Sequence, residues 1–288
     1  MPELPEVEAL ADFLRERLVG RVVARVDVAS ISALKTYDPP VTSLAGLQIT
    51  GVGRRGKFLD IDADGVHLVV HLARAGWLRW KETLPPAPPR PSAKNPLALR
   101  VHLDDGTGFD LTEAGTRKKL SISVVRSPEE VPGVARLGPD PLDPSFDQAA
   151  FDTVLAEHPR TQLKGLLRDQ SVIAGIGNAY SDEILHAARM SPFKLAGSLD
   201  ADGRATLFGA LVECLAQALQ RSRGLPASDL KDDKRAAMSV HGRTGLACPV
   251  CGDVVREVSF ADSALQYCAT CQTGGKPLAD RRMSKLLK

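Results

Sequence analysis

Four cysteines near the carboxyl end are the feature that most constrains the fold of this chain. Cys248 and Cys251 form one CxxC pair, Cys268 and Cys271 form a second, and sixteen residues separate the pairs. Four thiolates at this spacing can surround one zinc ion, with a β-hairpin joining two cysteine knuckles. The segment from Cys248 onward is too short and polar to bury a core of its own, so zinc would supply its folding free energy.

Two other readings of the cysteines are weaker. Two disulfides are disfavoured in a cytosolic chain, and a redox CxxC is disfavoured without a thioredoxin-like context. Because four cysteines leave no coordination position open, we expect one structural Zn²⁺ and no chemistry at the metal.

Composition limits the class of protein. The chain has 288 residues, 43% of them hydrophobic and 25% charged, which is typical of a soluble globular protein with one large or two ordinary domains. It has no apolar stretch of membrane-spanning length and no signal-peptide pattern, so we expect a cytoplasmic protein without a membrane partner.

The net charge of +2 is too small to identify an acidic partner, but the cations are clustered. Such clusters can contact phosphates, and each can equally be an ordinary solvated surface. The clusters are Arg54, Arg55 and Lys57; Arg117, Lys118 and Lys119; and Arg281, Arg282, Lys285 and Lys288.

The first half of the chain predicts a helix followed by a sheet-rich domain. Val7, Leu10, Leu14 and Leu18 recur at helical spacing before Gly20. From residue 22 to about 125, short β-rich runs alternate with Gly and Asp. We expect a hairpin between Trp80 and Leu97, with the proline-rich residues 84–96 forming an exposed loop.

The second half predicts a hinge and then helices. Proline and glycine interrupt every period in residues 128–144, which indicates a hinge between the halves. Helices are expected at 151–157, 163–168, 178–188 and about 204–221. In the last of these the apolar stripe places Cys214 in the core; its members are Leu207, Leu211, Cys214, Leu215 and Ala218.

The first residues carry a possible nucleophile. A start methionine before a small residue is normally trimmed, which would leave Pro2 with a free secondary amine. Such an amine can attack an aldehyde-like carbon and form an iminium, and the neighbouring carboxylate of Glu3 could move the protons. The plainer alternative is a proline that only precedes a helix.

Residues 174–182, AGIGNAYSD, have the composition of an anion site. Two glycines followed by Asn178 at the expected start of a helix leave backbone N–H groups uncovered, which suits a phosphate. A plain helix-turn-helix corner is the alternative. Lys57, behind a glycine turn in GRRGKFLDI, could likewise reach a backbone phosphate or be an exposed hairpin lysine. The histidines show no metal-ligand or nucleophile spacing, so a core or surface role is expected for each: His67, His71, His102, His158, His186 and His241.

Taken together, the motifs resemble the formamidopyrimidine-DNA glycosylase and endonuclease VIII family of helix-two-turn-helix DNA glycosylases. The resemblance covers nearly the whole chain, in the order PELPEVE at 2–8, RRGK at 54–57, DQSVIAGIGNAYSDEIL at 169–185, and the CxxC pairs followed by Gln272.

The resemblance implies an α+β fold. An amino-terminal helix and β-sandwich form the catalytic domain at 1–130, and a linker follows at 131–147. A helix-two-turn-helix DNA-binding domain is expected at 148–240, and a β-hairpin zinc finger at 241–288.

The resemblance also implies roles for residues. Pro2 would attack the sugar C1′ of a damaged nucleotide, expel the base and form an iminium, with Glu3 handling proton transfers and Lys57 completing the catalytic group. The iminium would permit β-elimination and δ-elimination without an organic cofactor. Further DNA contacts would come from Gly177, Asn178, Arg74, Arg117 and Lys118, with Glu6 and Glu183 in support.

Two residues and one loop depart from the family pattern. Arg74 replaces a methionine that helps fill the hole left by a flipped base, and the loop 112–120 lacks its aromatic wedge. Ser263 stands where relatives carry a phosphate-gripping arginine, for which Arg256, Arg243 or the tail cations could substitute.

Three hypotheses follow from the matches and departures. The first is a bifunctional glycosylase and AP lyase that excises oxidised bases, with an altered lesion range. The second is a catalytically weak or inactive damaged-DNA-binding protein of the same fold. A zinc-dependent protein-interaction module is the third, and it leaves Lys57 and Asn178 unexplained. The expected partner is damaged or abasic duplex DNA, bound by a monomer associated with the nucleoid.

Overall fold

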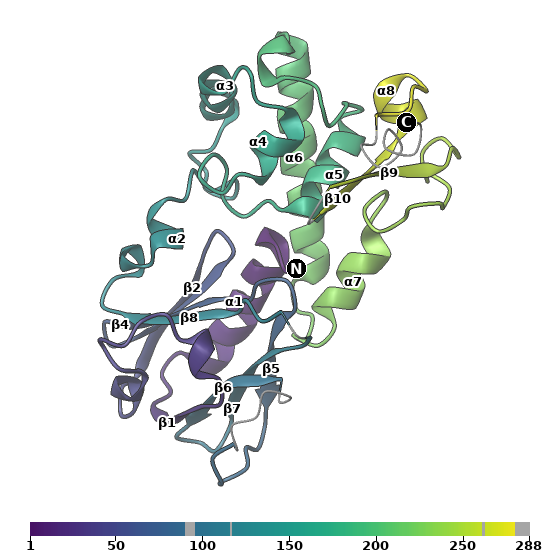
Figure 1. The fold of residues 1–288 in the computed structure, drawn as a ribbon. Helices are drawn as coiled ribbons and strands as arrows, with labels where there is room; N and C mark the ends of the chain where they lie inside the picture. Colours follow the sequence, from purple (N-terminus) through teal and green to yellow (C-terminus); the bar gives the residue numbers. More distant parts are fainter. Residues whose placement is uncertain (90–95, 116, 261–262, 280–288) are drawn as a thin grey trace. The chain divides into compact units, whose positions relative to one another are not determined.

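The structure is a computed structural model that describes residues 1–89, 96–115, 117–260 and 263–279 (Figure 1). The chain forms two compact units. The first comprises Met1–Leu137 and Arg221–Lys231, and the second comprises Gly138–Gln220 and Asp232–Lys288.

The first unit contains one long helix and two four-stranded antiparallel sheets. Helix α1 spans Leu4–Leu18. One sheet has the order β1 (Val23–Val28), β6 (Leu97–Leu103), β7 (Gly108–Glu113), β5 (Gly76–Lys81). The other has the order β2 (Ile49–Arg55), β3 (Phe58–Ala63), β4 (Val66–His71), β8 (Ser121–Val125). Short 3-10 helices lie at Ile31–Ala33, Val41–Leu44 and Pro128–Glu130.

One hydrophobic core joins α1 to both sheets. Leu10 and Leu14 of α1, Leu59 of β3 and Leu99 of β6 are completely buried in the same cluster. Helical spacing in α1 and alternation in the strands direct these side chains to a common interior. The predicted amino-terminal helix and β-sandwich are therefore confirmed.

The hairpin predicted between Trp80 and Leu97 is wrong. Strands β5 and β6 belong to the same sheet, but each pairs with β7, which lies between them. The sequence analysis did not include β7, in which the polar Asp110, Thr112 and Glu113 are buried along with the apolar residues. In the proline-rich segment the described residues 84–89 lie outside the strands, Leu84 is buried, and 90–95 lie outside the described residues.

The predicted hinge contains regular structure. A 3-10 turn at Pro128–Glu130 is followed by the one-turn helix α2 (Pro132–Ala135), and the two units divide between Leu137 and Gly138. The segment Arg221–Lys231 packs in the first unit, although the sequence analysis assigned it to the second domain. Its Ala227 and Leu230 are part of the first unit's core.

Helices dominate the second unit. They are α3 (Gln148–Glu157), α4 (Leu163–Arg168) and α5 (Asn178–Ala187), followed by a 3-10 turn at Ala196–Ser198. Near the end of the long helix α6 (Ala201–Ser222) the chain passes into the first unit. Helix α7 (Leu230–Ala237) leads back into the second unit.

The buried stripe of α6 is narrower than predicted. Leu207, Leu211, Leu215 and Ala218 are buried, but Cys214 is only partly buried. The placement of Cys214 in the core is therefore wrong. Steps of four, four and three residues define the stripe, and Cys214 lies one residue, or about 100°, to its side.

The carboxyl end forms the predicted hairpin. Strands β9 (Val255–Ser259) and β10 (Ala264–Cys268) pair in antiparallel fashion between the two CxxC pairs, and α8 (Ala269–Thr273) follows. Among the described residues, no helix has the length and apolar character needed to cross a membrane.

Candidate functional site

The amino terminus is held by a capping box. The Glu3 backbone N–H donates to Glu6 Oε2 at 2.8 Å, and the Glu3 carboxylate accepts from the Glu6 backbone N–H. This exchange satisfies two of the exposed donors at the start of a helix and fixes Glu3. The geometry gives Glu6 a direct positioning role toward Glu3.

Pro2 precedes this capping box in the chain. Pro2, Glu3 and Glu6 are buried, whereas Met1 is 47% exposed. With Met1 attached, the Pro2 nitrogen is an amide and not a nucleophile. Removal of Met1 would convert it to a secondary amine.

Lys57 occupies a two-residue turn between β2 and β3. Gly56 has φ 54° at the first turn position, a backbone conformation that favours glycine and matches the twist of the flanking strands. Lys57 is only 7% exposed. The alternative of an exposed hairpin lysine is therefore wrong.

His71 is a neighbour of Lys57 that the sequence analysis did not select. It pairs with Phe58 across β3 and β4, and the two rings lie 4.8 Å apart between centroids. Burial, together with the positive charge of Lys57, lowers the pKa of His71 from 6.5 to about 4. His71 is therefore neutral at pH 7 and can contribute one donor and one acceptor. The pairing of β3 with β4 would have brought it beside Lys57, but a lone histidine at a strand end gave no other signal.

The other two cations of the first basic cluster have carboxylate partners. Arg54 forms an ion pair with Glu8 of α1, which joins β2 to the helix. Arg55 lies 3.1 Å from Asp60 and 3.2 Å from Glu129. These pairs give Arg54 and Arg55 structural roles.

Arg74 is presented by a tight turn. Ala73 has φ 52°, a left-handed conformation that is uncommon for a residue with a side chain, and the Gly76 N–H donates to the Leu72 carbonyl at 2.9 Å. The Arg74 side chain is exposed. The turn thus carries a long cation where relatives are expected to have a methionine.

The loop after β7 lies beside this turn. The Ala114 N–H donates to the Ala75 carbonyl, and the Glu113 carboxylate accepts the N–H groups of Lys119 at 2.7 Å and Leu120 at 3.0 Å. Glu113 therefore fixes both ends of the loop. Arg117 is exposed and Lys118 is partly exposed. The Arg74 turn and the loop after β7 therefore both carry cations that reach solvent.

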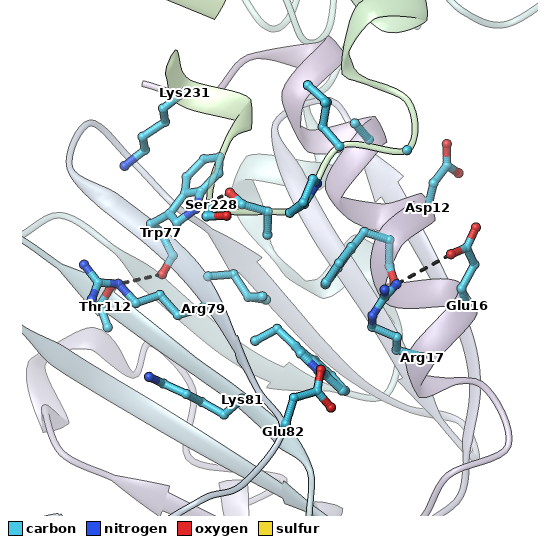
Figure 2. A pocket seen from close by; sticks show the side chains of 18 of the residues that line it. Asp12, Glu16, Arg17, Trp77, Arg79, Lys81, Glu82, Thr112, Ser228 and Lys231 are labelled. Carbon is cyan, nitrogen blue, oxygen red and sulfur yellow. Dashed lines mark hydrogen bonds and ion pairs between the residues drawn. The ribbon is translucent and has the colours of Figure 1, made fainter. Parts of the chain in front are cut away.

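A cavity of about 750 Å³ lies in the first unit between α1, β5 and residues 224–231 (Figure 2). This volume is within the range of small-molecule sites. Phe13, Trp77 and Trp80 contribute aromatic surface, and Lys231 lies 4.4 Å from the Trp77 ring centroid. Charged side chains surround this apolar surface; they include Asp12, Glu16, Arg17, Arg79, Lys81 and Glu82. A flat aromatic ligand with polar edges fits such a lining.

Trp77 also fixes one wall of the cavity. Its indole N–H donates to the Ala227 carbonyl at 2.8 Å, although 150 residues separate the two in sequence. This bond holds residues 224–231 against β5 in the first unit.

In the second unit the predicted phosphate site is the start of α5. Gly177 is the N-cap residue and Asn178 the first helical residue. Asn178 Nδ2 donates to the Ala264 carbonyl of β10 at 2.7 Å, while its buried Oδ1 has no hydrogen-bond partner among the described residues. Asn178 thus already connects the helix to the hairpin of the finger.

A buried ion pair supports the start of α5. Lys164 of α4 donates to the Asn178 carbonyl at 2.9 Å and to Asp182 Oδ1 at 2.6 Å. The second oxygen of Asp182 lies 2.8 Å from His241 Nδ1. Lys164 and Asp182 are both nearly inaccessible to solvent. The network links α4, α5 and the segment that leads into the finger.

Glu183 has a direct structural contact. Its carboxylate accepts backbone N–H groups of Ser239, Val240 and His241 at 2.7, 2.9 and 2.8 Å. It therefore holds the segment before the zinc knuckle. Its expected electrostatic support of the amino terminus stays a prediction, because Glu183 belongs to the second unit with Gly177 and Asn178, whereas Pro2 and Lys57 belong to the first.

The four cysteines form the metal site predicted from their spacing. Their sulfurs all lie within 4.8 Å of one another, with 3.3 Å between Cys251 and Cys268 and 3.9 Å between Cys248 and Cys271. A zinc ion bound tetrahedrally at about 2.3 Å requires sulfurs about 3.8 Å apart, so the residues fit one structural zinc. Gln272 closes the second knuckle by accepting the Cys268 N–H at 2.9 Å.

Hydrogen bonds favour the thiolate form of Cys248. Burial acts to raise the pKa of Cys248, but backbone N–H groups of Val250 and Cys251 and the ring of His186 outweigh burial and lower it. His186 Nε2 lies 3.2 Å from Cys248 Sγ.

Two of the cations expected to substitute for an arginine at position 263 lie in the described residues. Ser263 accepts the Phe260 N–H with its carbonyl at 2.7 Å, near the end of the hairpin. Arg256 on β9 is exposed and Arg243 is partly exposed. The tail cations Arg281, Arg282, Lys285 and Lys288 lie outside the described residues.

Family models match along most of the chain. Residues 1–120 match the formamidopyrimidine-DNA glycosylase N-terminal domain, 137–228 the corresponding H2TH domain, and 245–274 a zinc finger found in FPG and IleRS. This combination defines a helix-two-turn-helix DNA glycosylase class with a zinc finger. The chain belongs to the formamidopyrimidine-DNA glycosylase family.

Individual relatives agree with this assignment. The chain is 38% identical over 269 residues to the formamidopyrimidine-DNA glycosylase of Moorella thermoacetica, covering 90% of this chain and 94% of the relative. An uncharacterized formamidopyrimidine-DNA glycosylase-like protein of Mycobacterium tuberculosis is 57% identical over 152 residues, covering 53% of this chain and 94% of that protein. The Lactococcus lactis glycosylase, solved non-covalently bound to DNA containing an AP site, has a TM-score of 0.79 at 26% identity and covers 94% of this chain and 99% of its own.

Proposed function

We propose that this protein is a DNA-repair glycosylase with AP lyase activity that acts on damaged or abasic duplex DNA. The observation that carries the proposal is the buried Pro2–Glu3 start of α1, held by the capping box with Glu6. Family membership and the DNA-bound relative support DNA as the partner.

The Pro2 amine, once Met1 is removed, attacks the sugar C1′. A C–N bond forms as the bond from C1′ to the base breaks, and the base leaves with the proton that the Pro2 nitrogen gives up. The C1′–O4′ bond then opens, O4′ takes a proton, and C1′ becomes the carbon of an iminium. The iminium withdraws electrons from C2′, so loss of a C2′ proton drives cleavage of the C3′–O bond. Glu3 moves the protons in these steps.

Phosphate contacts come from both units. Lys57, Arg74, Arg117 and Lys118 serve the first unit, and Gly177 with Asn178 serve the second. Lys57 is selected from its cluster for its place in the two-residue turn between β2 and β3. Glu183 supports the Asn178 end by fixing the segment before the finger.

Lesion choice is altered by the two turns beside β5. A methionine or aromatic wedge supplies apolar contact, which offsets the base stacking lost when a base is displaced. An exposed arginine supplies a charge in place of that apolar contact. The exposure of Arg74 and the absence of an aromatic residue in 112–120 support a lesion range that differs from that of the relatives.

We assign the displaced base to the cavity of Figure 2, since Ala75 of the Arg74 turn forms part of its wall and aromatic rings can stack on a base. The test is Ser228→Trp, which puts bulk at an exposed position on the cavity wall. It should abolish excision of an oxidised base yet leave the reaction with an abasic site unchanged. Arg223→Trp, exposed but outside the cavity lining, is the matched control. Equal excision by both variants would reject the assignment.

Borohydride trapping tests the central chemistry. Protein whose Pro2 terminus is verified by mass spectrometry should be trapped on abasic DNA, and protein that retains Met1 should not. Glu3→Gln should reduce base excision more than DNA binding. Glu157→Gln, an exposed change at the end of α3, is the control.

A damaged-DNA-binding protein without cleavage is the second candidate, favoured by the altered turns and by Ser263. Tight binding to abasic DNA with no trapping by the verified Pro2 form would establish that candidate and reject the enzyme.

A further inference from the structure

We propose that His186 is a positioning residue of the zinc site, which donates a hydrogen bond to the Cys248 thiolate and thereby fixes the zinc knuckle to helix α5. The contact is direct: His186 Nε2 lies 3.2 Å from Cys248 Sγ. Both residues are buried, with 5% and 2% of their surface exposed. Water therefore has little access to replace the histidine as a donor.

The ring acts from outside the metal's coordination shell. The described groups that could hold one metal together are the four cysteines, and His186 is not a member of that set. Within the described residues the His186 Nε2 contact is with Cys248, which makes the ring a donor to one ligand and not a replacement for it. Such outer contacts orient ligands and tune a metal site.

The charge of the site requires such donors. Four thiolates around Zn²⁺ carry two net negative charges, and Cys248 and Cys268 are almost fully buried. A buried charge without hydrogen bonds is costly. Backbone N–H groups serve Cys248 from within the finger, and His186 reaches it from α5.

His186 also completes a row of contacts along α5. Asn178, Asp182 and His186 are spaced four residues apart and share one helix face. They bond in turn to the Ala264 carbonyl, the His241 ring and the Cys248 sulfur. Figure 1 shows β10 and α8 beside α5, in agreement with their direct contacts. One helix face therefore positions the finger at three points, and its first residue is the proposed phosphate ligand.

The experiment measures the rate at which zinc passes from the full-length protein to a chromogenic chelator. A glutamine amide reaches as far as histidine Nε2 and keeps the donor, whereas asparagine is too short and phenylalanine fills the space without donating. We expect release to be about 10- to 100-fold faster in His186→Phe and His186→Asn, and near the wild-type rate in His186→Gln. His158→Phe, at the residue that follows α3, controls for loss of a histidine.

A second readout reports the sulfur–metal bond itself. In the cobalt-substituted protein, the thiolate-to-metal absorption should shift in His186→Asn and stay near the wild-type position in His186→Gln. Equal release rates in the Asn and Gln variants, or unshifted cobalt spectra in both, would overturn the proposal. The Asn and Gln pair keeps the test decisive if the Phe variant fails to fold, and neither readout depends on the proposed DNA chemistry.

Discussion

Phe58 and His71 face each other across β3 and β4, with ring centroids 4.8 Å apart, immediately beside Lys57. The pairing places an imidazole in an apolar and electropositive environment. Both features favour the neutral ring, as its pKa of about 4 records.

The first prediction concerns pH and stability. Because the folded pKa of His71 lies below its ordinary value of 6.5, the unfolded chain binds the proton more readily. His71 should therefore cost no stability above pH 6.5, reduce the free energy of unfolding as pH falls from 6.5 to 4, and add no further loss below pH 4. The full loss is up to about 3 kcal/mol. The measurement is urea unfolding of wild type and His71→Gln across this range. Parallel pH profiles for the two proteins would contradict the prediction.

The second prediction concerns Trp77. Trp77→Phe keeps the ring but removes the donor to the Ala227 carbonyl, which leaves a buried acceptor without its partner. We expect a loss of about 1–3 kcal/mol in stability. Hydrogen exchange should rise in residues 224–231. Trp80→Phe is the control, since the Trp80 N–H bonds to the exposed Glu82. Equal exchange in both variants would count against the role of Trp77.

The third prediction concerns Lys164. Lys164→Met leaves Asp182 buried without its cation and should destabilise the second unit by about 3–5 kcal/mol. Lys164→Met combined with Asp182→Asn should recover part of that loss, because the uncompensated charge is gone. Thermal unfolding of the single and double variants gives the comparison. A double variant less stable than the single one would show that charge burial is not the cause.

The fourth prediction concerns Lys57. Lys57→Ala should weaken DNA binding across sequences and reduce the slope of log K against log salt by about one. Arg55→Ala is the matched control, because Arg55 already pairs with Asp60 and Glu129. Binding measured from low to physiological salt tests both variants. An unchanged slope in Lys57→Ala would remove Lys57 from the phosphate contacts.

The fifth prediction concerns zinc removal. Chelation should raise hydrogen exchange in residues 248–274 and weaken DNA binding, because Asn178 bonds to β10 of the finger. Exchange within α1 and the sheets of the first unit should stay unchanged. Metal analysis of freshly prepared protein should give one zinc per chain, and its absence would contradict the four-thiolate site.

Local sequence determined those features that depend on spacing along the chain. The period of Val7, Leu10, Leu14 and Leu18 was enough to define α1, and the two CxxC pairs were enough to define a metal site joined by a hairpin. Both are short-range patterns, since a helix face repeats within four residues and a knuckle within three. The ordered set of motifs was likewise enough to identify the family.

Tertiary structure decided which partner each charged side chain contacts. Arg54, Arg55 and Lys57 look alike in sequence, but Arg54 pairs with Glu8 of α1, Arg55 pairs with Asp60 and Glu129, and Lys57 is buried in the turn between β2 and β3. Tertiary structure also decided that β7 inserts between β5 and β6. It likewise placed His186 beside Cys248, which is 62 residues away in sequence. Periodicity specifies which face of an element is buried, whereas the residue that meets it depends on how distant segments pack, and that information is present only in the folded chain.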